Sequence, residues 1–262
     1  MTTGIQGKVT LVSGASRGIG KAIAAAFAGE GARFALCARD EDALNLAADE
    51  IRAQTHADVL TVKANLTKIN DVKRFVAAAV KRFERIDILV NNAGGAHVGG
   101  ILATTDEEWE YHLQLKLLGY IRMAREVIPN MMANGGRIIN IAGMTAKEPG
   151  PLFMVPGVTN SAILNFTKAL AKEFEKNNIL VNSINPATTD TPLTLESIQK
   201  LAAAFQKTPD EVRASLTASM PQGRIAAPED VAGVALFLAS DAARFVSGTA
   251  ISVDAGKSLG VW

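Results

Sequence analysis

The segment with the clearest chemical potential is a glycine-rich turn, the motif SGASRGIG at residues 13–20. An apolar run at residues 9–12 precedes it, and an alanine-rich helical pattern begins at Lys21. The order is therefore strand, turn and helix. Glycine allows a sharp bend and lets backbone N–H groups approach a pyrophosphate at the start of a helix. The segment predicts a site for the phosphates of a nucleotide.

The type of nucleotide is indicated at the end of the next predicted strand. In dinucleotide-binding folds, a carboxylate at this point binds the ribose hydroxyls of NAD(H), whereas the 2′-phosphate of NADP(H) requires cations. The carboxylate position holds Ala38, and Asp40 comes one residue too late. Arg39 follows Ala38, and Arg17 stands within the glycine turn. These residues favour NADP(H) over NAD(H), with the alternative that both arginines are solvated surface residues.

These residues need a scaffold, and the sequence predicts one in which strands alternate with helices. The predicted strands are residues 9–12, 33–38, 59–63, 86–90, 137–141, 179–184 and 249–253. The predicted helices are residues 21–29, 41–54, 69–83, 106–134, 156–177 and 227–239. The strands are continuous apolar runs, which is typical of a parallel sheet with helices on both faces. No break marks a boundary, so we predict a single α/β domain over residues 1–262.

One segment interrupts the alternation, at about residues 191–223. It carries two predicted helices, residues 193–206 and 209–219, before the last α/β unit. Excursions at the carboxyl edge of such a sheet often cover a ligand crevice. We expect a substrate lid here, with a surface embellishment as the alternative.

Composition excludes several classes of function. The 262 residues include 27 Lys and Arg against 26 Asp and Glu, a net charge of +1, and no charge run favours nucleic acid or an anionic membrane. The single cysteine, Cys37, cannot form an internal disulfide. Residues 1–7 lack the apolar core of a signal peptide. We expect a cytoplasmic protein with no metal site.

Further motifs follow in a fixed order along the chain: NNAG at 91–94, NSINP at 182–186, APEDV at 227–231, SG at 247–248 and VDAG at 253–256. Together with the glycine turn, they resemble the short-chain dehydrogenase/reductase family over nearly the whole chain. The resemblance implies a Rossmann-type, doubly wound sheet of seven parallel strands. It also implies a homotetramer or homodimer packed through helices 106–134 and 156–177, or a hetero-oligomer with a homologue.

The resemblance assigns a cofactor role to each matching position. Around the phosphates and the adenine, these positions are Gly14, Ser16, Arg17, Gly18, Ile19, Gly20, Arg39, Asn65 and Leu66. Around the ribose and the nicotinamide, they are Asn92, Ala93, Gly94, Pro186, Ala187, Thr189 and Thr191. Two positions depart from the family pattern, which usually has aspartate in place of Asn65 and glycine in place of Ala187.

The catalytic positions depart much further. The family uses a tyrosine that transfers the proton, a lysine one helical turn later, a serine that orients the carbonyl and an asparagine that links the lysine to water. Aligned on the motif FTKAL at 166–170, the tyrosine and lysine positions hold Pro156 and Asn160. The serine and asparagine positions hold Gly143 and Lys116. All four family residues are therefore absent.

Lysine and asparagine have exchanged places between Lys116 and Asn160. In the family fold these positions are neighbours through water, so an ammonium can remain in the site from the opposite helix. The alternative is coincidence, with Lys116 extending to solvent. Other polar side chains near the predicted crevice are Thr145, Thr159, Ser161, His97 and His112. We interpret Tyr111 and Tyr120 as packing residues.

Three functions remain open from the sequence. The first is an atypical NADP(H)-dependent oxidoreductase that acts on a carbonyl or alcohol through Lys116 and Asn160. The second is an inactive nucleotide-binding protein or partner subunit of an active homologue, and the third is a lyase or isomerase that uses Lys116. The substrate stays unknown, although an apolar crevice wall or lid packing is indicated by Phe153, Met154, Val155, Leu193 and Leu195.

Overall fold

The computed structural model describes residues 3–260 and contains a seven-stranded sheet. The strand order is β3-β2-β1-β4-β5-β6-β7, and every neighbouring pair is parallel. The strands are β1 (Val9–Ser13), β2 (Arg33–Ala38), β3 (Val59–Lys63), β4 (Ile88–Asn91), β5 (Gly136–Ile141), β6 (Ile179–Pro186) and β7 (Ala250–Val253). The predicted doubly wound, Rossmann-type fold is confirmed. The order reverses between β1 and β4, which opens a crevice at the carboxyl ends of these strands.

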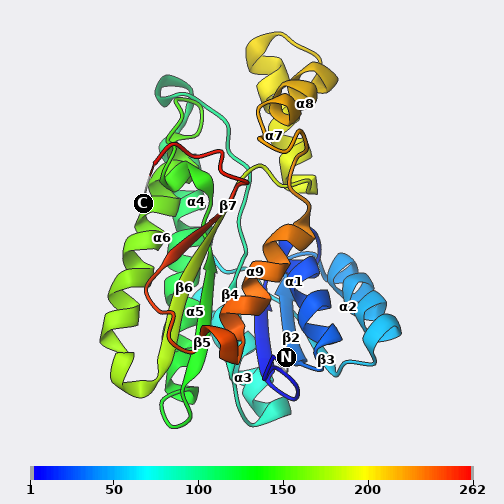
Figure 1. Cartoon of the computed structure of the whole chain (residues 1–262), viewed down its shortest axis with the longest axis vertical. Coiled ribbons are helices and arrows are strands. Elements are labelled where there is room, and N and C mark those ends of the chain that lie inside the picture. The colour runs from blue at the N-terminus through cyan, green and yellow to red at the C-terminus, as the bar shows by residue number, and fades with distance from the viewer. Residues whose placement is uncertain (1–2, 261–262) are drawn as a thin grey trace.

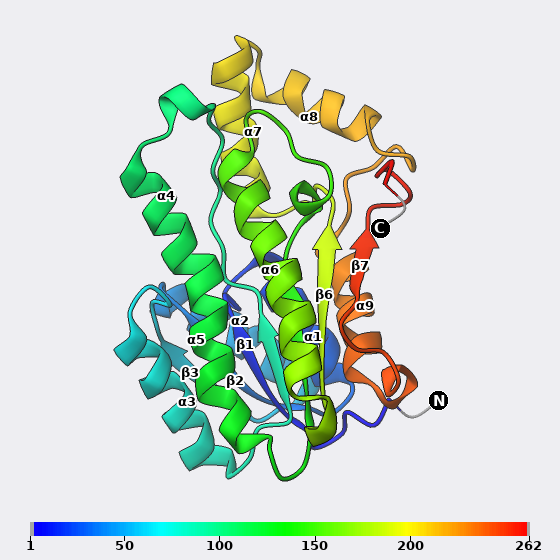
Figure 2. The same cartoon turned by 90° about the vertical axis from the view of Figure 1, so that its left-hand side faces the viewer.

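Helices cover both faces of the sheet, as Figures 1 and 2 show. One face carries α1 (Gly18–Gly29), α2 (Glu41–Thr55) and α9 (Pro228–Ala239). The other carries α3 (Ile69–Phe83), α5 (Leu118–Val127) and α6 (Met154–Glu173). Neighbouring residues of β1 belong to different cores, since Val12 packs with the first set of helices and Leu11 with the second. This explains why the strands are continuous apolar runs.

The predicted helix over residues 106–134 is not a single element. It begins as α4 (Asp106–His112), capped by Thr105, passes through a π-helical turn (Leu113–Leu117) and continues as α5. The α-helix ends at Val127, earlier than predicted, and a 3₁₀ turn (Ile128–Asn130) follows. Pro129 lies in that turn, where it has no N–H to continue the helix. The π-helical turn contains Lys116, and such turns are frequent at functional sites.

The interrupting segment forms α7 (Pro192–Phe205) and α8 (Pro209–Ala218), which project beyond the carboxyl edge of the sheet (Figures 1 and 2). Ile198 and Val212 form a small separate core between these helices. Val98 and Phe153, from two loops of the main body, pack against this core. The predicted span of 1–262 also includes residues 1–2 and 261–262, which lie outside the described residues.

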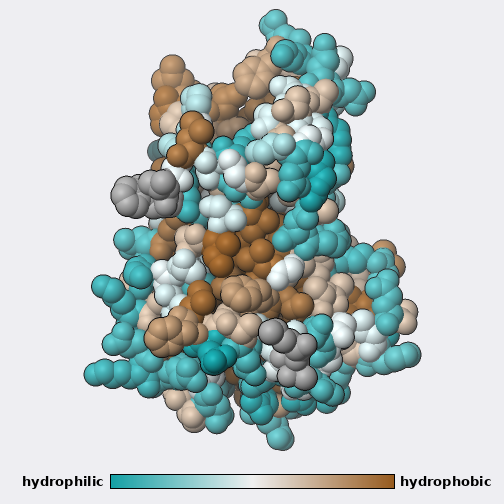
Figure 3. Space-filling model, viewed as in Figure 1, coloured by the Kyte–Doolittle hydropathy of each residue, from teal (hydrophilic) through white to brown (hydrophobic). Residues whose placement is uncertain are grey.

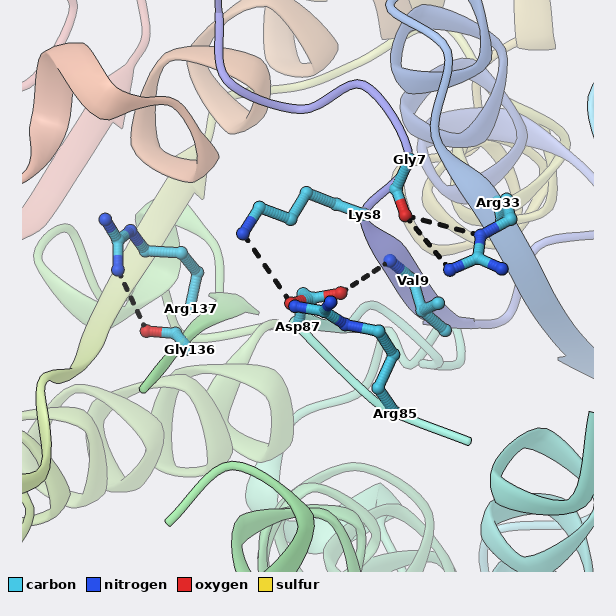
Figure 4. A network of polar contacts seen from close by, with 8 residues as sticks. All are labelled: Gly7, Lys8, Val9, Arg33, Arg85, Asp87, Gly136 and Arg137. Atoms are coloured by element: carbon cyan, nitrogen blue, oxygen red, sulfur yellow. Dashed lines mark hydrogen bonds and ion pairs between the residues drawn. The ribbon is translucent and has the colours of Figure 1, made fainter. Parts of the chain in front are cut away.

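A polar network stabilises the opposite, amino end of the sheet (Figure 4). The buried carboxylate of Asp87 accepts a hydrogen bond of 2.9 Å from the backbone N–H of Val9. It also pairs with Arg85 and lies 3.7 Å from the ammonium of Lys8. These contacts join β1 to the start of β4, far from the carboxyl edge, so we assign them to the scaffold.

An apolar region lies on the side that carries β7 and α9 (Figure 3). Figure 3 shows apolar side chains gathered in the middle of this face. Phe237 on α9 is 43% exposed, and Phe245 after it is fully exposed. Within residues 3–260, no helix combines the length and the apolar character that crossing a membrane requires.

Candidate functional site

A cavity of about 760 Å³ opens at the carboxyl edge of the sheet, where the strand order reverses. Its volume falls in the range of ligand pockets. The predicted cofactor residues that line it are Gly14, Ser16, Arg17, Gly18, Ile19, Arg39, Leu66, Asn92, Ala93, Gly94, Pro186, Ala187, Thr189 and Thr191. Two predicted cofactor residues, Gly20 and Asn65, are not among the lining residues.

Gly20 shapes the glycine turn from behind. A Cβ atom added there would lie 2.4 Å from both the backbone oxygen of Gly14 and Nδ2 of Asn92. That amide donates hydrogen bonds to the oxygens of Ser13 (3.1 Å) and Gly14 (3.0 Å). Gly14 and Gly18 have left-handed backbone, with φ of +67° and +58°. The turn is therefore fixed against the segment after β4, and Gly20 permits this close approach.

Asn65 also acts within the chain and not at the cavity surface. Its Oδ1 accepts hydrogen bonds from the backbone N–H (3.1 Å) and the hydroxyl (3.0 Å) of Thr67. Its own backbone N–H donates to Asp71 on α3. Asn65 thus forms the turn that presents Leu66, which does line the cavity.

Three charged side chains surround the end of β2. The carboxylate of Asp40 accepts a hydrogen bond from the N–H of Ala43 at 3.1 Å and caps α2. Arg17 pairs with Glu196 of α7 at 3.4 Å, and both side chains are exposed. Arg39 donates a hydrogen bond to the phenol oxygen of Tyr111. The carboxylate of Asp40 is therefore engaged in the helix cap, whereas Arg17 and Arg39 both line the cavity.

Lys116 and Asn160 are in direct contact, without an intervening water. Nζ of Lys116 donates to Oδ1 of Asn160 at 2.8 Å and to the backbone oxygen of Ala142 at 2.9 Å. Nδ2 of Asn160 donates to Oγ1 of Thr145 at 2.9 Å. Lys116 lines the cavity, whereas Asn160 is buried behind it. Burial lowers the pKa of Lys116 to about 8.

The absence of a side chain at Gly143 leaves room for the amide of Asn160. Gly143 lines the cavity, and a Cβ atom added there would lie 2.7 Å from Nδ2 of Asn160. Any side chain at 143 would therefore displace the amide that binds Lys116. Pro156 is the third residue of α6, inside the first helical turn, where its missing N–H costs no hydrogen bond. The helix begins at Met154, two residues before the predicted start.

The other candidate donors are engaged elsewhere. The hydroxyl of Thr159 donates to the backbone oxygen of Val155 at 2.8 Å, and that of Ser161 donates to Ala146 at 3.2 Å. His97 is buried against His112, with ring centroids 5.3 Å apart. Burial lowers the pKa of His97 and lowers that of His112 to about 4, so both rings are neutral at pH 7. None of these four residues lines the cavity.

The two tyrosines have different surroundings. Tyr120 is fully buried and donates to the backbone oxygen of Ile141 at 3.0 Å, as expected of a packing residue. Tyr111 is 39% exposed; its ring packs against His112, as expected, but its phenol also binds Arg39, a contact not predicted from the sequence. The sequence did not indicate the contact between Tyr111 and Arg39, because the two residues are 72 positions apart.

The end of the cavity near α7 and α8 is apolar. Of the predicted wall residues, Phe153 and Leu193 line the cavity, and Met154, Val155 and Leu195 do not. The other apolar lining residues at this end are Ile198, Leu201 and Leu216.

Comparison with known proteins identifies the family. A family model described as enoyl-(acyl carrier protein) reductase matches residues 14–258. Oxidoreductase UcpA of Salmonella typhimurium is 35% identical, over 97% of this chain and 96% of the relative. The 3-oxoacyl-[acyl-carrier-protein] reductase FabG of Thermotoga maritima is 33% identical, over 96% and 98%.

A solved structure agrees with these relatives. L-sorbose reductase from Gluconobacter frateurii, complexed with NADPH and L-sorbose, has a TM-score of 0.93 and 35% identity, and the match covers 100% of both chains. The strand order, the cavity at the reversal point and these relatives converge on one assignment. The chain belongs to the short-chain dehydrogenase/reductase family.

Proposed function

We propose that this protein is an atypical NADP(H)-dependent oxidoreductase that acts on the carbonyl or alcohol group of an apolar substrate. In this proposal Lys116, held by Asn160, replaces the tyrosine and lysine of the family. One observation carries the proposal: Lys116 lines the same cavity as the glycine turn, and its ammonium is hydrogen-bonded to Asn160. Family membership and the NADPH-bound neighbour support the choice of cofactor.

The cavity residues fit a nicotinamide dinucleotide. The left-handed glycines Gly14 and Gly18 bend the turn, and α1 begins at Gly18, so that the N–H groups of its first turn would bind the pyrophosphate. Arg39 and Arg17 supply positive charge for a 2′-phosphate. Thr189 and Thr191, which lie between β6 and α7, would hold the nicotinamide end. When bound, the cofactor supplies or accepts a hydride.

Lys116 supplies the proton chemistry in this proposal. An ammonium has three N–H donors, and two of those of Lys116 are used by Asn160 and Ala142. The third can donate to a substrate carbonyl oxygen in the cavity. With a pKa of about 8, Lys116 can give its proton during reduction and take it back during oxidation near neutral pH. Asn160 and the backbone oxygen of Ala142 hold the ammonium in place, and Thr145 holds Asn160.

The apolar lining near α7 and α8 supports a substrate with an apolar body. Phe153, Leu193 and Ile198 lie at this end of the cavity, and α7 and α8 would act as the lid. We further propose a homotetramer or homodimer, supported by family membership and by the exposed apolar side chains of Phe237 and Phe245.

A second candidate is an inactive nucleotide-binding subunit. Gly143 and Pro156 carry no proton donor where the family has serine and tyrosine, and this observation favours it. The two candidates differ in the behaviour of the isolated protein, because both bind the cofactor and only the oxidoreductase turns it over.

We expect the purified protein to consume NADPH in the presence of a panel of apolar ketones and aldehydes, and to use NADH less well. The measurement is the loss of nicotinamide absorbance, with the protein omitted as one control and the carbonyl omitted as another. Tight NADPH binding without turnover on any member of the panel would favour the inactive subunit. Absence of NADPH binding would contradict both candidates.

A further inference from the structure

Arg39 and Tyr111 form a polar pair between two elements that are distant in sequence. Arg39 follows the end of β2 and lines the cavity, whereas Tyr111 belongs to α4 on the other side of the sheet. Nη1 of Arg39 donates a hydrogen bond to the phenol oxygen of Tyr111. The pair therefore fixes a guanidinium at the position where the second strand ends.

The charge of Arg39 is not compensated within residues 3–260. Among the ion pairs of these residues, none includes Arg39. Arg17 differs, because Glu196 lies 3.4 Å from it. Asp40, the carboxylate next to Arg39 in sequence, accepts a hydrogen bond from Ala43 instead. Arg39 is thus a cation available to an anionic ligand in the cavity.

The geometry of Tyr111 suits a role in orienting this cation. Its phenol oxygen accepts the hydrogen bond from Arg39, so its own O–H remains available to donate. Its ring packs edge-on against His112, with centroids 5.3 Å apart and an interplanar angle of 84°. A long arginine side chain loses rotamer freedom when it binds a ligand, and a partner that holds it beforehand reduces this loss.

We propose that Tyr111 is a positioning residue for the 2′-phosphate of NADP(H). It holds the Arg39 guanidinium at the cavity, so that it contributes through Arg39 to discrimination against NAD(H). This inference rests on the proposed NADP(H) preference, and its test separates the two.

The test is a fluorescence titration of the purified full-length chain with NADPH and with NADH, which requires no catalytic turnover. For Tyr111→Phe, we expect the Kd for NADPH to rise about 3- to 10-fold, the loss expected of a typical hydrogen bond. The Kd for NADH is expected to stay within about twofold, since the 2′-hydroxyl carries no charge. For Arg39→Ala, we expect a larger rise with NADPH alone.

Tyr120→Phe is the matched control, because the chain has only two tyrosines and the phenol of Tyr120 bonds inside the core. It should lower the melting temperature without changing the ratio of the two Kd values. If Arg39→Ala weakens NADPH binding and Tyr111→Phe does not, the role of Tyr111 is overturned and the NADP(H) preference stands. If neither Arg39→Ala nor Tyr111→Phe changes the ratio of the Kd values for NADPH and NADH, then Arg39 does not bind the 2′-phosphate. That result would contradict both the role of Tyr111 and the proposed basis of the NADP(H) preference.

Discussion

Replacing Lys116 with methionine is expected to lower the turnover number for NADPH-dependent carbonyl reduction by about 10²- to 10⁴-fold, the usual contribution of general acid catalysis. Methionine keeps most of the side-chain length and removes the ammonium. Because Lys116 is the residue that we place at the reacting oxygen, the loss should fall on kcat, with little change in the Kd for NADPH. Steady-state kinetics and cofactor titration of the same preparation measure the two quantities.

The matched control for this variant is Lys172→Met, which removes an ammonium from the exposed face of α6. It should leave kcat within about twofold, as surface substitutions generally have small effects. A Lys116→Met variant with unchanged kcat would show that another group transfers the proton, because methionine has no proton to donate.

Introducing serine at Gly143 is expected to reduce activity on the order of 10²-fold, although serine is the residue that the family has there. A Cβ atom at 143 would lie 2.7 Å from Nδ2 of Asn160, closer than atoms in contact allow. The amide must shift, which disturbs its hydrogen bonds to Lys116 (2.8 Å) and Thr145 (2.9 Å). A displacement of about 1 Å at a reacting group can cost about 10²-fold in rate.

Two further variants test this steric coupling. Gly100→Ser is the matched control, because a Cβ atom at Gly100 meets nothing within 4 Å. In an Asn160→Ala background the clash is absent, so Gly143→Ser should cost far less than it does in the wild type. Equal costs in the two backgrounds would contradict the coupling, since the effect of serine would then be independent of Asn160.

Much of the scaffold could be predicted from the sequence, because it depends on local patterns. Continuous apolar strands such as β1 predicted a sheet covered on both faces, and the structure confirms it. The break of the long helix was not predicted, because the π-helical turn at Leu113–Leu117 has no distinctive residue pattern. Pro129 was present as a signal, but its effect on the end of α5 was underestimated.

The candidate site was predictable where the motif itself determines the geometry. Gly14 and Gly18 of the glycine turn line the cavity as expected. Gly20 and Asn65 do not line it: Gly20 permits close packing of the turn against Asn92, and Asn65 forms the turn before Leu66. The exchange of Lys116 and Asn160 predicted proximity, but the direct hydrogen bond required the structure. The contacts of Thr145 with Asn160 and of Tyr111 with Arg39 could not be predicted from sequence, because each depends on how separate elements fold together.

The pH dependence of catalysis is the most direct test of the proposed role of Lys116. Burial lowers the pKa of this lysine to about 8, so the ammonium needed for reduction is present below that pH and lost above it. For the wild type, we predict that kcat for reduction is level in the acidic range and falls about tenfold per pH unit above pH 8. Oxidation of the corresponding alcohol should show the opposite dependence, rising toward pH 8 and levelling above it. A reduction rate that stays level from about pH 6 to about pH 10 would contradict the account, because no group with the pKa of Lys116 would then control the reaction.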